Sequence, residues 1–370
     1  MIVANGLADG PAQALRDYLV ARGVVVVTIF HPLTPEQGTR HAIATYQDGG
    51  LADERTVRLP VGPPLSFALD GFVPLLPPRV DVWFGFNPLA CARGLVARRQ
   101  GRARAVVLWS VDFVPNRFGA GTLRTRLYDR LDRLCCKRAD ARVELSVEAR
   151  DTRNRRHDLS SDAAPTHVVP MGAWVGRIAA VPEEGLRGRR VVFLGHLVPR
   201  QGVETLLEAL ALLSVRGEGV TGDIIGTGPL ERGLRERAKE VGVERTVRFH
   251  GFVPDHRDVE RILAGASIAV APYRSGGDTF TEYADPGKLK AYLAAGLPIV
   301  LTAVPPNAEQ LAREAGAEVV PYDASAIADA ISRGLASPER WQERRRAALE
   351  YARRFDWNLL LGDLLGQLRL

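Results

Sequence analysis

Short apolar runs alternate with stretches of helical spacing along the whole chain. The strands predicted in the first half span residues 24–30, 80–84, 105–109, 141–146 and 167–169. Residues 11–22 have the apolar spacing of a helix and follow the glycine-containing loop NGLADG. Strands that alternate with helices are typical of βαβ units around a parallel sheet, so the first half predicts one α/β domain.

The alternation stops after residue 169 and resumes at residue 190. The segment between them contains PMGAW and then AAVPEEGLRGRR, whose prolines, glycines and charges indicate a linker. The strands predicted after it span residues 191–195, 223–226, 246–249, 268–271, 299–302 and 318–321. The helices predicted among and after them span residues 203–214, 230–241, 259–264, 338–355 and 357–370. This order predicts two tandem Rossmann-like domains facing one another across a cleft, over residues 1–172 and 173–355.

Length and composition agree with this picture. A chain of 370 residues is long for a single core and favours two domains. The apolar fraction of 46% and the charged fraction of 25% are those of a globular protein. The N-terminus has no basic start followed by a long apolar segment, and the three cysteines show no metal-ligand spacing. We therefore expect a cytoplasmic protein without a bound metal.

The net charge of +6 is concentrated in residues 117–156, which contain twelve basic and six acidic residues. One interpretation is a solvated helix face. The other is a surface that meets anionic lipid on the inner face of a membrane, or a phosphorylated acceptor. Nucleic acid is not an expected partner, because no recognised nucleic-acid module or aromatic platform accompanies the charge.

Glycine-rich loops follow several of the predicted strands in the second half. They are GHLVPRQG (195–202), GTGP (226–229), FHGFVPDH (249–256) and TEYADPGK (281–288). In open parallel sheets the ligand lies beyond the carboxyl ends of the strands, so these loops are the candidate binding edge. In the last loop, Asp285-Pro286-Gly287-Lys288 opens a helix whose free N–H groups favour an anion.

The joint pattern resembles the donor-binding domain of GT-B glycosyltransferases of the large retaining family four. The segments that carry the resemblance, within about residues 190–325, are VVFLGHLVPRQGVETLLEAL, DIIGTGPLERGL, VRFHGFVPDH and PGKLKAYLAAGLPIV. The first half is similar more loosely, through WSVDFVPNRF and VVPMGAW, and FDW near the end is similar to the segment that precedes the family's last helix. The resemblance implies that helix 356–370 packs back on the first domain. It also implies a nucleotide-diphosphate sugar as donor substrate, with its diphosphate at the Pro286-Gly287-Lys288 turn.

The chain departs from the family pattern at three positions. His196 and Gln201 stand where an arginine and a lysine usually neutralise the diphosphate, and Ala291 stands where a glutamate usually holds the ribose. A decayed, inactive site is one interpretation. We prefer a site that redistributes positive charge onto Lys288, Lys290 and Arg200, because the Asp-Pro-Gly-Lys turn is well formed.

The resemblance implies a metal-independent reaction with retention, in which the leaving diphosphate accepts the acceptor's proton. Lys288 is expected to stabilise that phosphate, His196 to donate to the phosphate or sugar, and Asp112 to orient or deprotonate an acceptor hydroxyl. The residues expected to bind the donor are Gly195, Gln201, Gly226, Gly228, Gly251, Phe252, Glu282, Tyr283, Asp285, Pro286 and Gly287. No cofactor is expected, and the acceptor would be a small molecule or a lipid-linked one.

Two alternatives stay open. A decayed transferase would serve as a scaffold or binding protein and would bind nucleotides weakly or not at all. An inverting enzyme or a sugar-nucleotide epimerase would share the two-domain shape. A histidine base early in the first domain would favour that second alternative, and the N-terminal loop contains none.

Overall fold

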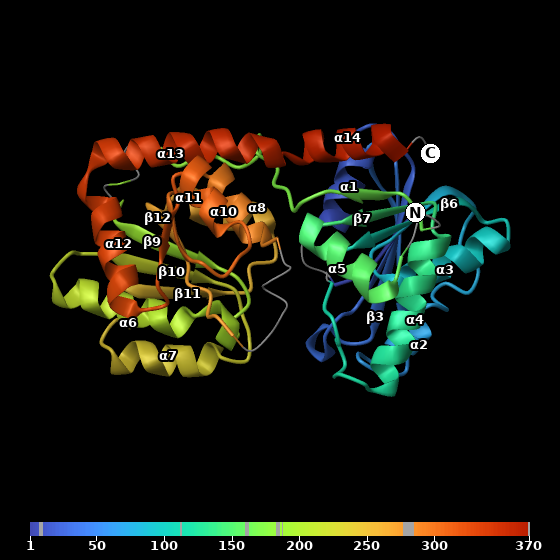
Figure 1. Ribbon diagram of the computed structural model, residues 1–370, viewed down its shortest axis with the longest axis horizontal. Coiled ribbons are helices and arrows are strands. Elements are labelled where there is room, and N and C mark those ends of the chain that lie inside the picture. Colours follow the sequence, from blue (N-terminus) through green and yellow to red (C-terminus); the bar gives the residue numbers. More distant parts are fainter. Residues whose placement is uncertain are drawn as a thin grey trace. The chain divides into compact units, whose positions relative to one another are not determined.

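The computed structural model describes residues 1–6, 10–111, 113–159, 163–182, 186, 188–276 and 285–368. The chain divides into two compact units (Figure 1). Unit 1 is Met1–Pro170 together with Trp357–Leu370, and unit 2 is Met171–Asp356. Each unit is an α/β structure built on one sheet.

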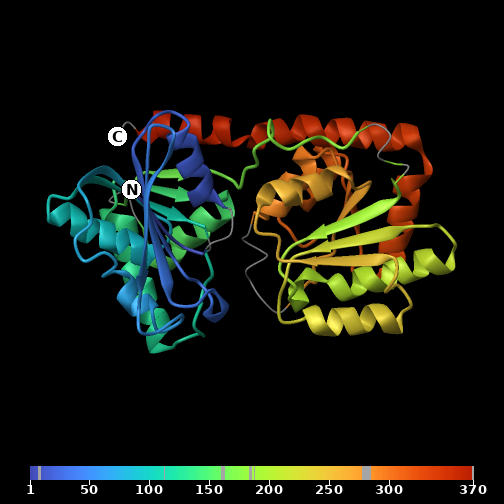
Figure 2. The same cartoon turned by 180° about the vertical axis from the view of Figure 1, so that it is seen from behind.

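Unit 1 contains an eight-stranded sheet with the order β4-β3-β2-β1-β5-β6-β7-β8. Its strands are β1 (Ile2–Asn5), β2 (Val26–His31), β3 (Arg40–Gln47), β4 (Gly50–Arg58), β5 (Val80–Gly85), β6 (Ala103–Ser110), β7 (Ala141–Glu144) and β8 (Thr166–Val168). Its helices are α1 (Pro11–Val20), α2 (Phe67–Asp70), α3 (Pro88–Arg99), α4 (Leu123–Arg138), α5 (Val147–His157) and α14 (Trp357–Leu368). The last helix, α14, contacts α1, as Figure 2 also shows.

An antiparallel hairpin, β3 and β4, extends the sheet of unit 1 beyond β2. Neither strand of this hairpin was predicted from the sequence, and β1 was not predicted either. For β4 the reason is that it is the edge strand and is exposed along almost its whole length. It therefore lacks the apolar alternation of a half-buried strand. The turn itself carried a readable signal, because Asp48 and Gly49 both have positive φ, as an Asp-Gly hairpin turn requires.

Unit 2 contains a six-stranded, wholly parallel sheet with the order β11-β10-β9-β12-β13-β14. Its strands are β9 (Arg190–Leu194), β10 (Thr221–Ile225), β11 (Val247–Gly251), β12 (Ile268–Ala271), β13 (Ile299–Thr302) and β14 (Glu318–Val320). Its α-helices are α6 (Val203–Val215), α7 (Glu231–Glu240), α8 (His256–Ala264), α10 (Gly287–Ala294), α11 (Ala308–Glu314), α12 (Ala324–Ala336) and α13 (Pro338–Ala352).

The two faces of this sheet are buried under different helices (Figure 1). Val191 and Phe193 of β9 pack with apolar residues of α6, α7 and α12. Val192, between them, packs on the other face with α8, α10, α11 and α13. Successive side chains of a strand point to opposite faces, so a strand covered on both faces is apolar throughout, as VVFL is.

Each sheet has one point where the strand order reverses. In unit 2 the chain runs from β9 through β10 to β11 and then returns to place β12 on the other side of β9. In unit 1 the corresponding strand is β1, with β2 on one side and β5 on the other. The carboxyl ends of strands beside such a reversal diverge and leave a place for ligands.

Candidate functional site

The loops that follow β9 and β10 are joined at the carboxyl edge of unit 2. The N–H of Gly195 donates to the carbonyl of Ile225 at 2.9 Å, and the N–H of Leu197 donates to the carbonyl of Thr227 at 2.9 Å. A Cβ at Gly226 would lie 2.0 Å from the carbonyl oxygen of Gly195, so only glycine permits this approach. A Cβ at Gly228 would lie 2.4 Å from the carbonyl oxygen of Leu197. The GTGP turn therefore fixes the loop after β9.

A second junction connects the loop after β9 to the loop after β12. Gly202 has φ +67°, and a Cβ there would lie 1.8 Å from the carbonyl oxygen of Pro272. The N–H of Arg274 donates to the carbonyl of Arg200 at 3.0 Å. Because β9 and β12 flank the reversal of strand order, this junction holds together the two loops that border the expected ligand position.

Lys288 lies at this reversal point. Its Nζ is 4.3 Å from the ring centre of Phe193, at the end of β9, and 4.4 Å from the ring centre of Tyr273, just after β12. It also donates to Oε1 of Gln201 at 2.5 Å. The ammonium group is thus held by two aromatic faces and an amide oxygen, a neutral environment that attracts a cation without neutralising it.

No carboxylate pairs with Lys288 among the described residues, which exclude 277–284. Burial accordingly lowers the pKa of Lys288 well below its usual value of 10.5. The hydroxyl of Tyr273 is also buried and has no hydrogen-bond partner among the described residues. An anion that reached this position would supply the missing charge and acceptor atoms.

Pro286 and Gly287 form the start of α10, as the anion-binding interpretation requires. Pro286 is the N-cap and has extended backbone angles, and Gly287 is the first helical residue. A Cβ at Gly287 would come within 3.0 Å of Cε of Met171. Lys288 is the second residue of α10. Its side chain and the free backbone N–H groups of the first turn therefore belong to the same end of the helix.

Asp285 and Lys290 form an ion pair with each other. Nζ of Lys290 donates to Oδ1 of Asp285, and the N–H of Met171 donates to Oδ2 of Asp285 at 2.8 Å. Lys290 is also 4.4 Å from the ring centre of Phe355 and is 1% exposed. The expectation that Lys290 takes over phosphate charge was therefore wrong, because a buried carboxylate already neutralises it.

The other expected donor residues lie along the same edge, and some are open to solvent. His196 is exposed and follows Gly195, and Gln201 holds Lys288 as described above. Gly251 ends β11, and Phe252 after it is 62% exposed. Asp112, Glu282 and Tyr283 lie outside the described residues, so their expected roles stay predictions.

The basic segment 117–156 is not simply a solvated face. Arg142 is buried and donates to the carbonyl of Ala164 at 3.2 Å. Arg153 is buried and pairs with Asp132 at 2.5 Å and with Glu144 at 2.9 Å. Two of the twelve basic side chains are thus internal parts of unit 1.

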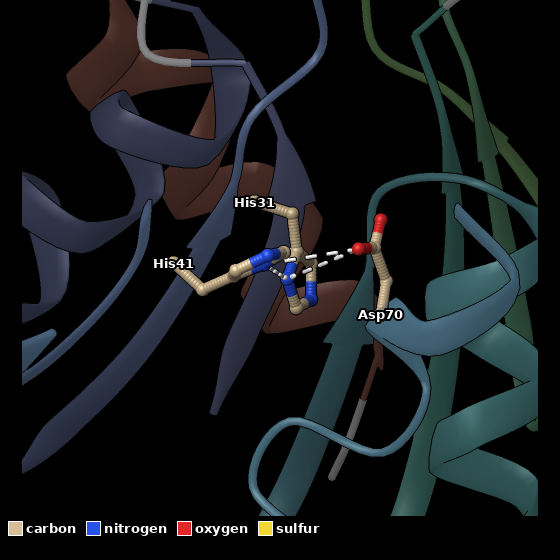
Figure 3. Close-up of side chains that lie close together, drawn as sticks. All are labelled: His31, His41 and Asp70. Carbon is tan, nitrogen blue, oxygen red and sulfur yellow. Dashed lines mark hydrogen bonds and ion pairs between the residues drawn. The ribbon is translucent and has the colours of Figure 1, made fainter. Parts of the chain in front are cut away.

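A cluster of two histidines and an aspartate lies at the carboxyl ends of β1 and β2 in unit 1 (Figure 3). It contains His31, His41 and Asp70, which are 3%, 0% and 5% exposed. Burial, followed by the charge of His41, lowers the pKa of His31 to about 3. Burial raises the pKa of Asp70 to about 6, against the opposing hydrogen bond from Asn5. This cluster was not predicted from the sequence, because its members are far apart in the chain. His41 lies on the unpredicted strand β3, and Asp70 lies on α2.

Residues 188–337 match the family model described as "Glycosyl transferases group 1". The chain is 30% identical over 178 residues to the GDP-mannose-dependent alpha-(1-6)-phosphatidylinositol dimannoside mannosyltransferase of Mycobacterium tuberculosis, covering 48% of this chain and 43% of that protein. It is 29% identical over 212 residues to the phosphatidyl-myo-inositol mannosyltransferase of Mycobacterium leprae, covering 56% of this chain and 53% of that protein. The chain thus spans about half the length of these relatives, or less.

Among solved structures, sucrose-phosphate synthase from Thermosynechococcus elongatus is similar with a TM-score of 0.71. The sequence identity is 18%, and the match covers 100% of this chain and 96% of that chain. This likeness extends over both units and confirms the expected two-domain fold class.

Proposed function

We propose that this chain, a member of the group 1 glycosyltransferases through residues 188–337, transfers a sugar from a nucleotide-diphosphate sugar to an acceptor hydroxyl. We further propose that the reaction proceeds with retention of configuration and without a divalent metal. The observation that carries the proposal is the environment of Lys288. Its ammonium group has aromatic and amide neighbours, and no carboxylate among the described residues pairs with it.

The diphosphate of the donor fits this environment by charge. It would meet Nζ of Lys288 and the free N–H groups at the start of α10 together, and both favour an anion. A bound phosphate would also raise the pKa of Lys288 again and keep it protonated. The GDP-mannose dependence named for the Mycobacterium tuberculosis relative supports a nucleotide sugar of this class.

In the proposed reaction, the bond between the sugar and the diphosphate breaks while the acceptor oxygen bonds to the same face of the sugar. The proton of the acceptor hydroxyl passes to the leaving diphosphate. Lys288 stabilises the negative charge that develops there, and the exposed His196 donates to the phosphate or the sugar. The chain's contribution is then orientation and charge stabilisation, with no protein nucleophile.

A nucleotide screen tests the donor site. A nucleoside diphosphate that binds only the native protein stabilises it by about 2.7 kcal/mol at a hundredfold excess over Kd. We expect at least one of UDP, GDP, ADP and TDP to raise the Tm of the wild-type chain, and the same nucleotide to raise the Tm of Lys288→Ala by less. Absence of any shift would favour the decayed scaffold.

The reaction type is tested with the donor that the screen identifies. We expect transfer to persist in excess EDTA, with no gain from added magnesium or manganese, and the product to keep the donor's anomeric configuration by NMR. Inverted product, or an epimerised nucleotide sugar formed without an acceptor, would instead support the alternative enzymes.

The surface of α4 supports a lipid-linked acceptor at an anionic membrane. Leu123, Leu127 and Leu134 are 69%, 54% and 47% exposed, and their spacing of four and seven residues places them on one stripe of the helix. Arg126 and Arg130 are exposed on the same helix. An apolar stripe beside basic side chains is typical of helices that lie at a membrane surface. None of the helices in the described ranges combines the length and hydropathy needed to cross a membrane.

Vesicle sedimentation tests the membrane contact. We expect the chain to sediment with phosphatidylglycerol vesicles and to stay in solution with phosphatidylcholine vesicles, because each basic residue near an anionic surface contributes about 1 kcal/mol. The double variant Leu123→Ser with Leu127→Ser should bind the anionic vesicles more weakly at unchanged Tm. Equal binding by wild type and this variant would exclude α4 as the contact.

A further inference from the structure

The cluster in unit 1 brings three metal-ligating atoms to one point. Nδ1 of His31 and Nδ1 of His41 are 2.8 Å apart. Oδ1 of Asp70 is 4.0 Å from the first nitrogen and 3.7 Å from the second. Figure 3 shows the two rings and the carboxylate turned toward one another. The point in the plane of these three atoms that is equidistant from them lies about 2.1 Å from each, which is the length of a zinc–nitrogen or zinc–oxygen bond.

Protons alone leave this cluster incompletely satisfied. The two Nδ1 atoms share one hydrogen bond, so one of them donates and the other accepts. Oδ1 of Asp70 is buried and has no hydrogen-bond partner within the described ranges. Burying a carboxylate oxygen without a donor or a cation is costly. A cation between the three atoms would bond to all of them at once.

The surroundings of Asp70 resemble the outer shell of a metal site. Nδ2 of Asn5 donates to Oδ2 of Asp70 at 2.9 Å, which leaves Oδ1 directed at the histidines. Oδ1 of Asn5 in turn accepts from Nδ2 of Asn87 at 2.8 Å, and Asn87 is the N-cap of α3. Outer-shell hydrogen bonds of this kind orient metal ligands.

The nearby arginine does not neutralise the carboxylate. Arg93 lines the same small cavity as Asn5, His31 and Asp70. Its guanidinium donates to the carbonyls of Pro74 and Leu75. The cavity reaches His31 and Asp70, two of the three proposed ligands, and a fourth ligand such as water could approach from that side.

We propose that His31, His41 and Asp70 bind a single transition-metal dication, with zinc the preferred ion, at the carboxyl edge of unit 1. Imidazole nitrogens favour zinc over the harder magnesium and calcium, and three protein ligands with a water form a tetrahedral zinc site. The site belongs to unit 1 and is independent of the donor chemistry proposed for unit 2.

Metal binding is tested on the full chain without a histidine tag. The protein is stripped with a chelator, and cobalt(II) is added as a spectroscopic probe and zinc as a competitor. We expect one equivalent of cobalt to give the visible absorption of a four-coordinate site, zinc to displace it, and zinc but not magnesium to raise the Tm. Absence of both the absorption and the Tm shift would overturn the proposal and leave a hydrogen-bonded cluster.

Two variants locate the ion. Asp70→Asn keeps the size of the side chain but removes its charge, and His31→Gln removes a ligand nitrogen. Each should weaken cobalt binding by more than tenfold, whereas His256→Gln, on the surface of unit 2 and paired with Glu260, should leave it unchanged. If either cluster variant fails to fold, the wild-type titration still decides whether metal binds. Equal binding by a folded cluster variant and the wild type would place the ion elsewhere and overturn the proposal.

Discussion

Unit 1 buries a cation near the carboxyl edge of its sheet and unit 2 half-buries one, but the two cations have different partners. Arg153 of unit 1 contacts Asp132 and Glu144. Burial alone would lower the pKa of Arg153, but the charges of Asp132 and Glu144 outweigh it and hold that pKa above the usual range. Lys288 of unit 2 has only ring faces and an amide, and its pKa falls.

The difference separates a structural cation, Arg153, from Lys288, the cation to which the proposed function assigns anion binding. The acids around Arg153 leave no positive charge for a ligand to satisfy, and its guanidinium also donates to Oγ of Ser110 and lies 4.6 Å from the ring centre of Phe113. Lys288 keeps an unsatisfied positive charge at the point where ligands bind in open sheets. A charge of this kind costs stability in the free protein and favours an anion when one is present.

The largest effect should come from Arg153. Replacing it in Arg153→Met leaves Asp132 and Glu144 buried without their cation, and breaking a buried pair in this way costs about 3–5 kcal/mol. Urea unfolding measures the loss, with Arg232→Met as control because Arg232 is 93% exposed in its side chain. The surface control should lose less than about 0.5 kcal/mol. An equally small loss in Arg153→Met would mean that Arg153 is not a structural cation, and its contrast with Lys288 would disappear.

Gly202→Ala should have the next largest effect. The added Cβ would meet the carbonyl of Pro272 at 1.8 Å in a backbone conformation with φ +67°, so the two loops beside Lys288 must separate. We expect a loss of about 2–4 kcal/mol in the free energy of unfolding, together with weaker nucleotide binding.

The matched control is Gly233→Ala in α7, where an added Cβ meets nothing within 4 Å. Alanine is the better helix former there, so this variant should be more stable by about 0.5–1 kcal/mol. If Gly202→Ala and Gly233→Ala had the same free energy of unfolding and bound nucleotide equally well, the junction at Gly202 would not be needed to keep the two loops together.

Lys288→Ala tests the functional side of the comparison. The diphosphate would then meet only backbone donors, and hydrogen bonds to charged groups contribute about 1.5–3 kcal/mol each. We expect kcat/KM with a fixed acceptor to fall by about tenfold to a few hundredfold. Lys239→Ala on the exposed face of α7 should leave the rate unchanged.

A second substitution sharpens this test. Oε1 of Gln201 lies 2.5 Å from Nζ of Lys288, so a lysine at position 201 can bring its charge to nearly the same place. Adding Gln201→Lys to Lys288→Ala should recover part of the lost kcat/KM. A fully active Lys288→Ala enzyme would instead place the diphosphate elsewhere.

The sequence predicted the loops at the carboxyl edge of unit 2 better than the cluster of unit 1, for a physical reason. Glycine turns and the Asp-Pro-Gly-Lys start of α10 are local signals, readable over a few residues. Whether Lys288 or Lys290 carries a free charge depends on Asp285, whose partners are the N–H of Met171 and the ammonium of Lys290. His31, His41 and Asp70 come together only through strand pairing and α2, so no local pattern indicates them.

The smallest effect, and the most direct test of the comparison, concerns the cost of the unsatisfied charge on Lys288. Lys288→Met replaces the ammonium with an apolar group between the same rings, so it should raise the free energy of unfolding of the ligand-free protein. We expect a measurable gain near neutral pH, since burial disfavours the charged ammonium and methionine carries no charge to desolvate.

The gain from Lys288→Met should depend on pH in a defined direction. Between the lowered native pKa and the usual value of 10.5, the unfolded wild-type chain holds more protons than the native one, so wild-type stability rises with pH there. Methionine has no such proton, and the advantage of the variant should therefore be largest below the native pKa and shrink toward 10.5. Urea unfolding across this range measures it. A nucleoside diphosphate should shrink or reverse the difference by stabilising the wild type more than the variant. A methionine variant that is less stable at every pH would mean that the native protein already neutralises Lys288, and the anion would then have no reason to bind there.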